Sequence, residues 1–173
     1  MSVKRLTRGA LLTAIALTIF LVEAQIPPLA PVPGMKLGLA NIVTVYAMFA
    51  LGPMDALLIL LSRVILGSLF AGGMTLPYAL AGGLLCYLSM LVMRNFLTQK
   101  QLWVCGAIGA IFHNLGQMGA AILIARTPQL LYYLPVLTAT GILAGAFTGL
   151  CAQLLLERIG DRLQSICHRG HST

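Results

Sequence analysis

The chain has 173 residues, of which 59% are hydrophobic and only 9% are charged, and its mean hydropathy is +0.94. A soluble domain carries about 25% charged residues and roughly 45–50% apolar ones. Eleven Lys and Arg residues and four Asp and Glu residues are too few to cover a soluble globule of this size. The composition therefore predicts an integral membrane protein, and it excludes a soluble enzyme, a nucleic-acid-binding module and a disordered tail.

Six apolar runs follow one another along the chain. They cover residues 6–22, 37–51, 56–70, 76–93, 102–125 and 134–156. At about 20 apolar residues per span, such runs predict transmembrane helices. We therefore expect an all-α integral membrane protein, a six-helix bundle that occupies residues 1–173 as one domain, with the second and third spans the shortest.

The basic residues predict the orientation of this bundle. Cytoplasmic loops of membrane proteins carry an excess of Lys and Arg. With the N-terminus in the cytoplasm, the external loops hold only Lys36 and Arg126, and the C-terminus is also cytoplasmic. The cytoplasmic segments then hold Lys4, Arg5, Arg8, Arg94, Lys100, Arg158, Arg162 and Arg169. The net charge of +7 is thus explained by topology and needs no nucleic-acid partner.

Small residues recur at helical spacing in two spans. Gly141, Gly145 and Gly149 repeat every four residues in the sixth span, and Ala10 and Ala14 form a shorter series in the first. Such faces let helices approach closely in a bilayer, where lipid supplies no hydrophobic driving force for association. Each face can serve packing within the chain or docking of a partner subunit, and the spacing alone does not separate the two.

Arg63 is the only charged residue inside the third predicted span. Placing an ionisable group in the bilayer costs about 2.5–3.5 kcal/mol on insertion scales, so such a residue needs a partner. Asp55 is eight residues away, which is too far for a direct bond along one helix. The sequence leaves three alternatives: an ion pair with Glu23, contact with an anionic ligand, or extension of the side chain to the interface.

The fifth span carries three polar side chains within one and a half turns. His113 and Gln117 are four residues apart and share a face, and Asn114 lies on its flank. Polar groups in a lipid-embedded helix must face the bundle or a wet cavity. A buried structural histidine is the simpler interpretation for His113 alone, but the combination equally predicts a polar pocket.

A long proline-rich loop, predicted to be external, links the first two spans over residues 23–36. Its prolines make it stiff, so it can act as a lid or as a passive connector. The polar residues converge on an outward-facing site between this loop and the second, third and fifth spans. The residues that we expect to line a ligand site are Lys36, Asn41, Arg63, His113, Asn114 and Gln117.

No motif in the chain predicts catalysis. There is no phosphate-binding loop, no nucleophile elbow and no aspartate-rich motif for a magnesium diphosphate. One histidine beside two amides is a poor metal-ligand set, and the four cysteines have no paired spacing. We therefore predict no catalytic residue, no metal and no cofactor, and we expect a bundle that binds a small molecule.

Two segments resemble the signatures of a small membrane family. They are Pro33-Gly34-Met35-Lys36-Leu37-Gly38-Leu39-Ala40-Asn41-Ile42-Val43 and His113-Asn114-Leu115-Gly116-Gln117. That family is called heptaprenyl diphosphate synthase component I, or the Gx transporter family. It is similar to the substrate-binding S components of energy-coupling factor (ECF) vitamin transporters. The resemblance covers nearly the whole chain and implies six helices, cytoplasmic termini and a solute site near the outer face.

The two names of the family imply different functions. An S component captures a micronutrient and depends on a transmembrane scaffold subunit and a pair of ATPases, and the resemblance implies that Ala10 and Ala14 dock the scaffold. A component I would instead assist a soluble prenyltransferase that makes a C35 isoprenoid diphosphate. We expect transport as the main function and the accessory role as the alternative, in a multi-pass protein of a prokaryotic cell membrane.

Overall fold

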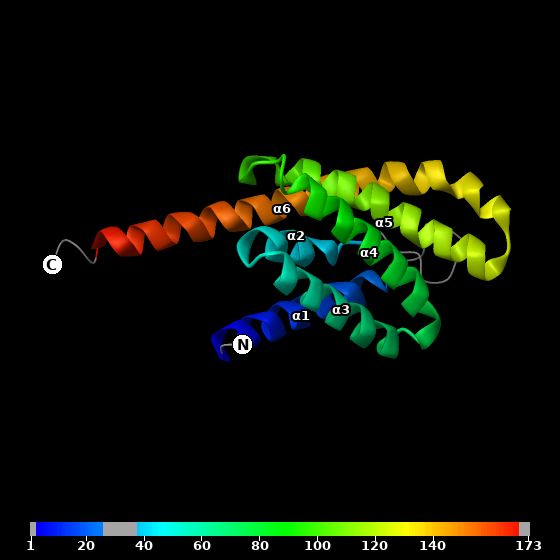
Figure 1. The fold of residues 1–173 in the computed structure, drawn as a ribbon, viewed down its shortest axis with the longest axis horizontal. Coiled ribbons are helices and arrows are strands. Elements are labelled where there is room, and N and C mark those ends of the chain that lie inside the picture. Colours follow the sequence, from blue (N-terminus) through cyan, green and yellow to red (C-terminus); the bar gives the residue numbers. More distant parts are fainter. Residues whose placement is uncertain (1–2, 26–37, 170–173) are drawn as a thin grey trace.

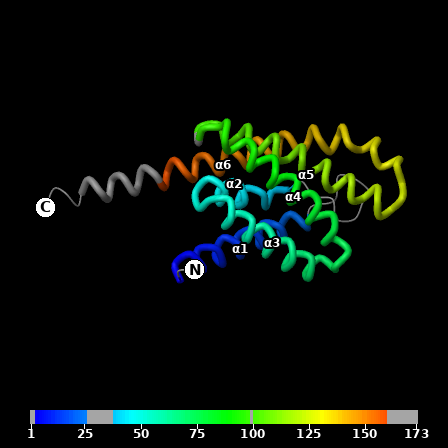
Figure 2. Tube along the Cα trace, in the orientation of Figure 1, coloured from blue at the N-terminus to red at the C-terminus, as the bar shows by residue number. Residues whose placement is uncertain are grey.

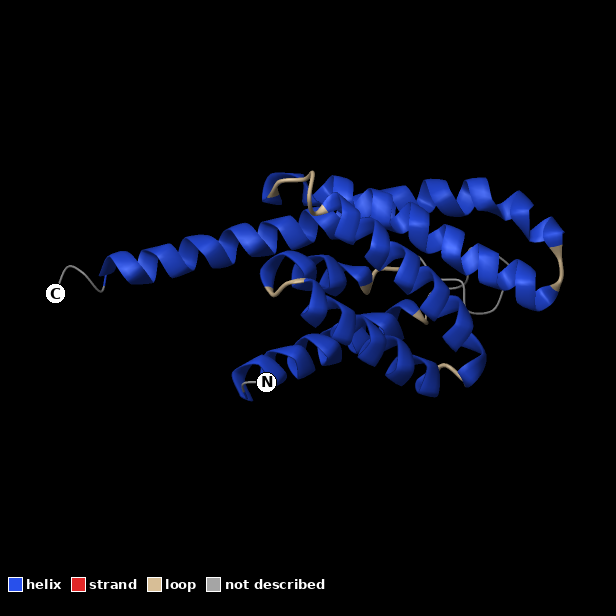
Figure 3. Cartoon of the chain, viewed as in Figure 1, coloured by secondary structure: helices blue, strands red, loops and turns tan. Residues whose placement is uncertain are grey.

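The computed structural model describes residues 3–25 and 38–169, without the side chains of residues 99 and 160–169. Within these residues the chain is helical and has no strand, as Figures 1 and 3 show. The all-α prediction is confirmed. The helices are α1 (Val3–Glu23), α2 (Asn41–Ala50), α3 (Pro53–Phe70), α4 (Leu76–Met93), α5 (Leu102–Ala125) and α6 (Leu134–Arg169), with short 3-10 helices η1 (Gly73–Thr75), η2 (Gln99–Gln101) and η3 (Pro128–Tyr133).

Five of the described helices are long and apolar enough to cross a membrane, namely α1, α3, α4, α5 and α6. The helices α4 and α5 begin and end at the same residues as the apolar runs 76–93 and 102–125. α6 is longer than the predicted 134–156, because its charged C-terminal part continues the helix beyond the apolar run. Figure 1 shows the C-terminal part of this helix leading away from the rest of the bundle, and Figure 2 traces the bundle in the same orientation.

α2 is the exception to the six-span prediction. It has 10 residues and is therefore about 15 Å long, half the thickness of the hydrocarbon core. It begins only at Asn41, because Gly38 adopts a positive φ of 80° and its carbonyl accepts a hydrogen bond from the Asn41 N–H in a tight turn. It ends before Gly52, which has a φ of 107° and precedes Pro53 at the start of α3. By length, α2 is a shorter apolar helix and is not among the five candidate membrane-spanning helices of the described residues, so the six-span prediction is not confirmed.

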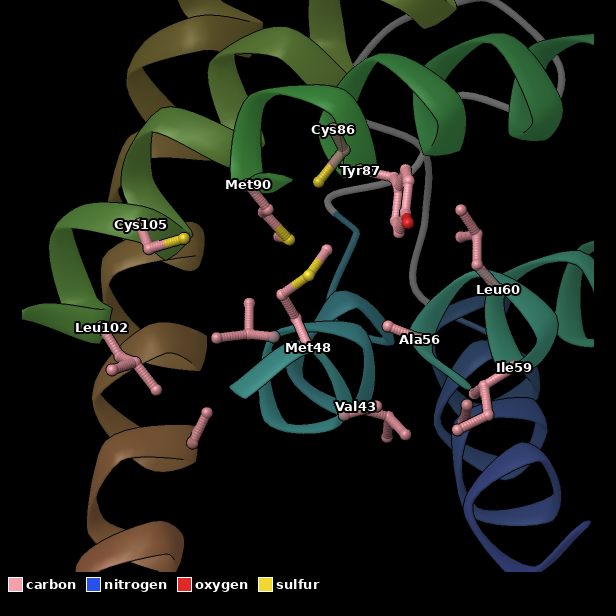
Figure 4. Close-up of a cluster of buried hydrophobic side chains, with 14 of the residues drawn as sticks. Val43, Met48, Ala56, Ile59, Leu60, Cys86, Tyr87, Met90, Leu102 and Cys105 are labelled. Atoms are coloured by element: carbon pink, nitrogen blue, oxygen red, sulfur yellow. The ribbon is translucent and has the colours of Figure 1, made fainter. Parts of the chain in front are cut away.

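The helices form two groups that share one core. α5 packs along both α4 and α6, whereas α1 packs mainly on α3, and α2 lies between these groups (Figure 1). Figure 4 shows Met48 of α2 pointing toward Met90 and Cys86 on α4, with Leu102 and Cys105 of α5 to one side in the same core. The cysteines thus act as small apolar residues in this core.

The small residues of α6 serve contacts within the chain. A Cβ added at Gly106 of α5 would meet the carbonyl oxygen of Gly145, and one at Gly149 would meet the carbonyl oxygen of Leu102. The third residue of the series, Gly141, lies against the side chain of Asn114. The backbones of α5 and α6 can approach this closely only where no side chain intervenes. This observation assigns the series of small residues on α6 to internal packing.

Gly106→Ala should therefore destabilise the protein by about 1–3 kcal/mol, since the new methyl group would press on the backbone of α6 rather than on a movable side chain. Gly119→Ala on the same helix is the matched control, because no other atom lies within 4 Å of an added Cβ there. Thermal unfolding of both variants in detergent measures the difference. Equal stability of the two variants would contradict the proposed close contact between α5 and α6.

Candidate ligand-binding site

A small cavity lies inside the bundle, near the junction of α1, α3, α4 and α5. It leaves about 20 Å³ in which the centre of a water molecule can move, which is room for about one water. Its walls combine apolar and polar side chains from four helices, from η1 and from the segment before α2. They are Phe20, Glu23, Gly38, Arg63, Val64, Thr75, Ala79, His113 and Gln117.

Arg63 reaches this cavity from the middle of α3 and is only 5% exposed. Its terminal nitrogen Nη2 donates a hydrogen bond to Oδ1 of Asn41, at 3.1 Å. Its Nε is buried and has no hydrogen-bond partner among the described residues. Asn41 thus fixes one end of the guanidinium and leaves a donor next to the cavity.

Of the two nearby acidic residues, the sequence excluded Asp55 as a partner of Arg63 and left Glu23. Asp55 forms an ion pair with Arg5 of α1, at 2.7 Å, which joins the beginnings of α1 and α3. Glu23 lines the same cavity as Arg63, at the end of α1. Its Oε1 accepts a hydrogen bond from the backbone N–H of Gly38, at 2.6 Å. This bond ties the end of α1 to the segment that leads into α2.

His113 and Gln117 lie one turn apart on α5 and are both buried. Gly82 of α4 makes room for them: a Cβ there would stand 2.7 Å from Cγ of Gln117 and 3.1 Å from Cε1 of His113. Gly38 lies against the other side of the His113 ring. Oε1 of Gln117 is buried without a hydrogen-bond partner in the described part of the chain. The face that the sequence assigned to both residues thus borders the cavity.

Asn114 faces α6 rather than the cavity that His113 and Gln117 line. Its Nδ2 donates a hydrogen bond to the carbonyl oxygen of Leu137 in α6, at 2.6 Å, and it does not line the cavity. The structure therefore brings together Arg63, Asn41, His113 and Gln117 and separates Asn114 from them. Lys36, the sixth residue expected at the site, lies outside the described residues.

Six cavity residues were not among those expected from the sequence, and three of these are polar residues or a glycine: Glu23, Gly38 and Thr75. Glu23 carried a signal, as the only acid predicted on the outer half of the bundle. Gly38 stands within the first family signature, but a glycine there predicts only a turn. Thr75 follows two glycines in a connecting segment, so nothing in its sequence context marks it. Its hydroxyl oxygen is nevertheless buried and lacks a partner among the described residues.

The arrangement brings several kinds of polar group to one cavity. The described walls of the cavity hold one guanidinium, one carboxylate, one imidazole, one hydroxyl and one amide. No cluster of three or more His, Cys, Asp or Glu residues suited to a metal ion is found in residues 3–25 and 38–159. Unpaired polar groups around an internal cavity are the feature by which small-molecule sites fix the orientation of a ligand.

A second hollow, open to the outside, runs between α1 and α3. This α1–α3 groove has a volume of about 580 Å³ and is mostly apolar. Ala10 and Ala14 line it and are exposed, so their small side chains are not used for packing between the described helices. The ion pair of Arg5 with Asp55 closes one end of the groove.

Comparison with known families gives one match. Residues 12–155 match the family described as heptaprenyl diphosphate synthase component I. The match covers most of the chain, and the protein belongs to this family. No curated protein and no solved structure gave a match.

Because Asn114 and Gln117 have different surroundings, their substitution by Leu should change the stability of the protein by different amounts. Asn114→Leu should lower the stability by about 1–3 kcal/mol, because it removes a buried hydrogen bond between α5 and α6. Gln117→Leu should leave the stability nearly unchanged, because its carbonyl oxygen has no partner to lose in the described structure. Thermal unfolding in detergent compares the two variants. A larger loss for Gln117→Leu than for Asn114→Leu would contradict these placements.

Proposed function

We propose that this member of the heptaprenyl diphosphate synthase component I family is a non-catalytic membrane subunit that binds a small molecule and acts through partner subunits. The observation that carries the proposal is the cavity between the helices, whose walls present buried polar atoms without partners in the described structure. These atoms belong to Arg63, Thr75, His113 and Gln117. Leaving such groups unpaired costs about 1–3 kcal/mol each. A bound molecule that pairs with them would recover this free energy.

The name of the family favours a role in prenyl diphosphate synthesis. Condensing prenyl diphosphates requires magnesium ions, which are held by clustered carboxylates and substrate phosphates. The chain has only two aspartates, Asp55 and Asp161, which lie far apart in sequence, and Asp55 is paired with Arg5. We therefore place the reaction in another subunit, a soluble prenyltransferase, and assign an accessory role to this chain.

A second candidate is the substrate-binding subunit of an ECF-type uptake transporter. Two features favour it: the buried polar cavity, and the exposed small-residue face of α1 along the α1–α3 groove. Small residues on a lipid-facing helix allow a partner helix to pack closely. Under this candidate, Ala10 and Ala14 contact a scaffold subunit, and a pair of ATPases supplies the energy.

Purification of the intact protein from its own membrane in mild detergent distinguishes the two candidates. Under the synthase role, a prenyltransferase chain copurifies, and synthesis of the C35 diphosphate falls when this protein is removed. Under the transport role, a scaffold and two ATPase chains copurify, and uptake of a solute depends on them. Recovery of neither set, with both activities unchanged in the protein's absence, would contradict the proposal that the chain acts through partners.

The α1 face can be tested separately. Changing both Ala10 and Ala14 to Leu should abolish copurification of a membrane partner, because bulky side chains keep a docked helix at a distance. Folding should be unaffected, since both positions are exposed. Ala139→Leu, at another exposed alanine on α6, is the matched control and should leave the complex intact. Loss of folding in the isolated double variant would assign Ala10 and Ala14 to packing within the chain.

A further inference from the structure

The charges around the cavity restrict what it can hold. Arg63 supplies one positive charge and Glu23 one negative charge, and the other described wall residues bring no further Lys, Arg, Asp or Glu. A diphosphate carries several negative charges, and proteins bind such groups through several cations, bidentate arginines or metal ions. The described walls hold one guanidinium and place a carboxylate close to it. Within the described walls, this balance favours a group without net charge.

The unpaired hydrogen-bonding atoms restrict the ligand further. Nε of Arg63 can only donate a hydrogen bond, whereas Oε1 of Gln117 can only accept one. The hydroxyl of Thr75 can do either. Nδ1 of His113 is a fourth such atom, and it can donate or accept according to the tautomer of the ring. All four atoms are buried and belong to residues that line the same cavity. A ligand that satisfies them must present an acceptor to Arg63 and a donor to Gln117 within a small volume.

We infer that the cavity recognises the neutral, amide-like end of a small molecule, in which a carbonyl oxygen lies next to an N–H group, and that it does not bind a diphosphate. This inference rests on the proposed function, because it names the ligand class of the same site. The carbonyl of such a group would accept from Arg63, and its N–H would donate to Gln117 or Thr75. With room for about one water, the cavity takes only this polar end, so the rest of the ligand extends outside the described walls.

Three probes of matched or contrasting chemistry test the inference on the full chain in nanodiscs. Benzamide offers an acceptor beside a donor, benzoate has the same shape with acceptors only, and geranyl diphosphate is a multiply charged isoprenoid. Binding is measured by the shift of the thermal midpoint and by ligand-observed NMR. Benzamide should bind, and benzoate and geranyl diphosphate should bind at least tenfold more weakly.

Thr75→Val removes the unpaired hydroxyl but keeps the shape of the side chain, and it should weaken benzamide binding by roughly five- to tenfold, the loss of one buried hydrogen bond. Gln117→Leu should act in the same direction. Thr18→Val is the control, because the Thr18 hydroxyl bonds to the Ala14 carbonyl on an exposed face of α1. Unchanged benzamide affinity in both Thr75→Val and Gln117→Leu would overturn the inference.

Two further results would also overturn it. If benzamide does not bind, the cavity serves a water molecule or another chemistry. If geranyl diphosphate binds and Gln117→Leu weakens it, the ligand class is wrong while the proposed binding role stands. The outcome for the ligand class therefore does not depend on which partner subunits copurify.

Discussion

The burial of Arg63 is the constraint on which the rest of the site depends. A guanidinium at membrane depth is tolerated only where protein groups or a polar cavity replace water around it. Asn41 meets part of this need with a hydrogen bond, and it stands at the first residue of α2 because the turn at Gly38 ends the preceding segment there. Gly38 in turn bonds to Glu23, which brings the end of α1 to the cavity. A single buried charge thus links three helices to one site.

Much of the fold could be predicted from hydropathy, because spanning helices have to be apolar over their whole length. α4 and α5 begin and end with their apolar runs, since glycines or charged residues interrupt the apolar sequence at their ends. Hydropathy did not predict the helix ends that depend on backbone conformation or on contact with water. Residues 37–40 are apolar, yet the positive φ of Gly38 delays the start of α2. The end of α6 is charged, and a helix can continue through charged residues where water surrounds it.

The candidate site was predictable in part for similar reasons. His113 and Gln117 border one cavity because residues four apart share a helical face. Asn114 follows His113 by one residue, hence by about 100° around the helix, and this rotation turns it toward α6. Thr75 could not have been found, because its role comes from the packing of η1 against α3 and α4, which places it at the cavity, rather than from any local pattern. Asn41 was named as a ligand residue, and the structure shows it holding Arg63.

The family match and the structure together support the proposal that this chain binds a small molecule while a partner subunit carries out the reaction or supplies the energy. The family name connects the chain to prenyl diphosphate synthesis, whereas the described part of the chain has a buried cavity with polar walls and an apolar groove along α1. An accessory subunit of a synthase and a binding subunit of a transporter both need a ligand site and a docking face. What separates them is the identity of the partner, since neither role requires catalytic residues in this chain.

The central claim is that the cavity beside Arg63 holds a small molecule in the native protein. Native mass spectrometry of the protein released directly from its own membrane tests this claim without assuming which molecule it is. The account predicts a bound small molecule in the unmodified protein and its loss in Gln117→Leu, with Thr18→Val retaining it. An unmodified protein that carries no added mass, or the same added mass in Gln117→Leu, would contradict it.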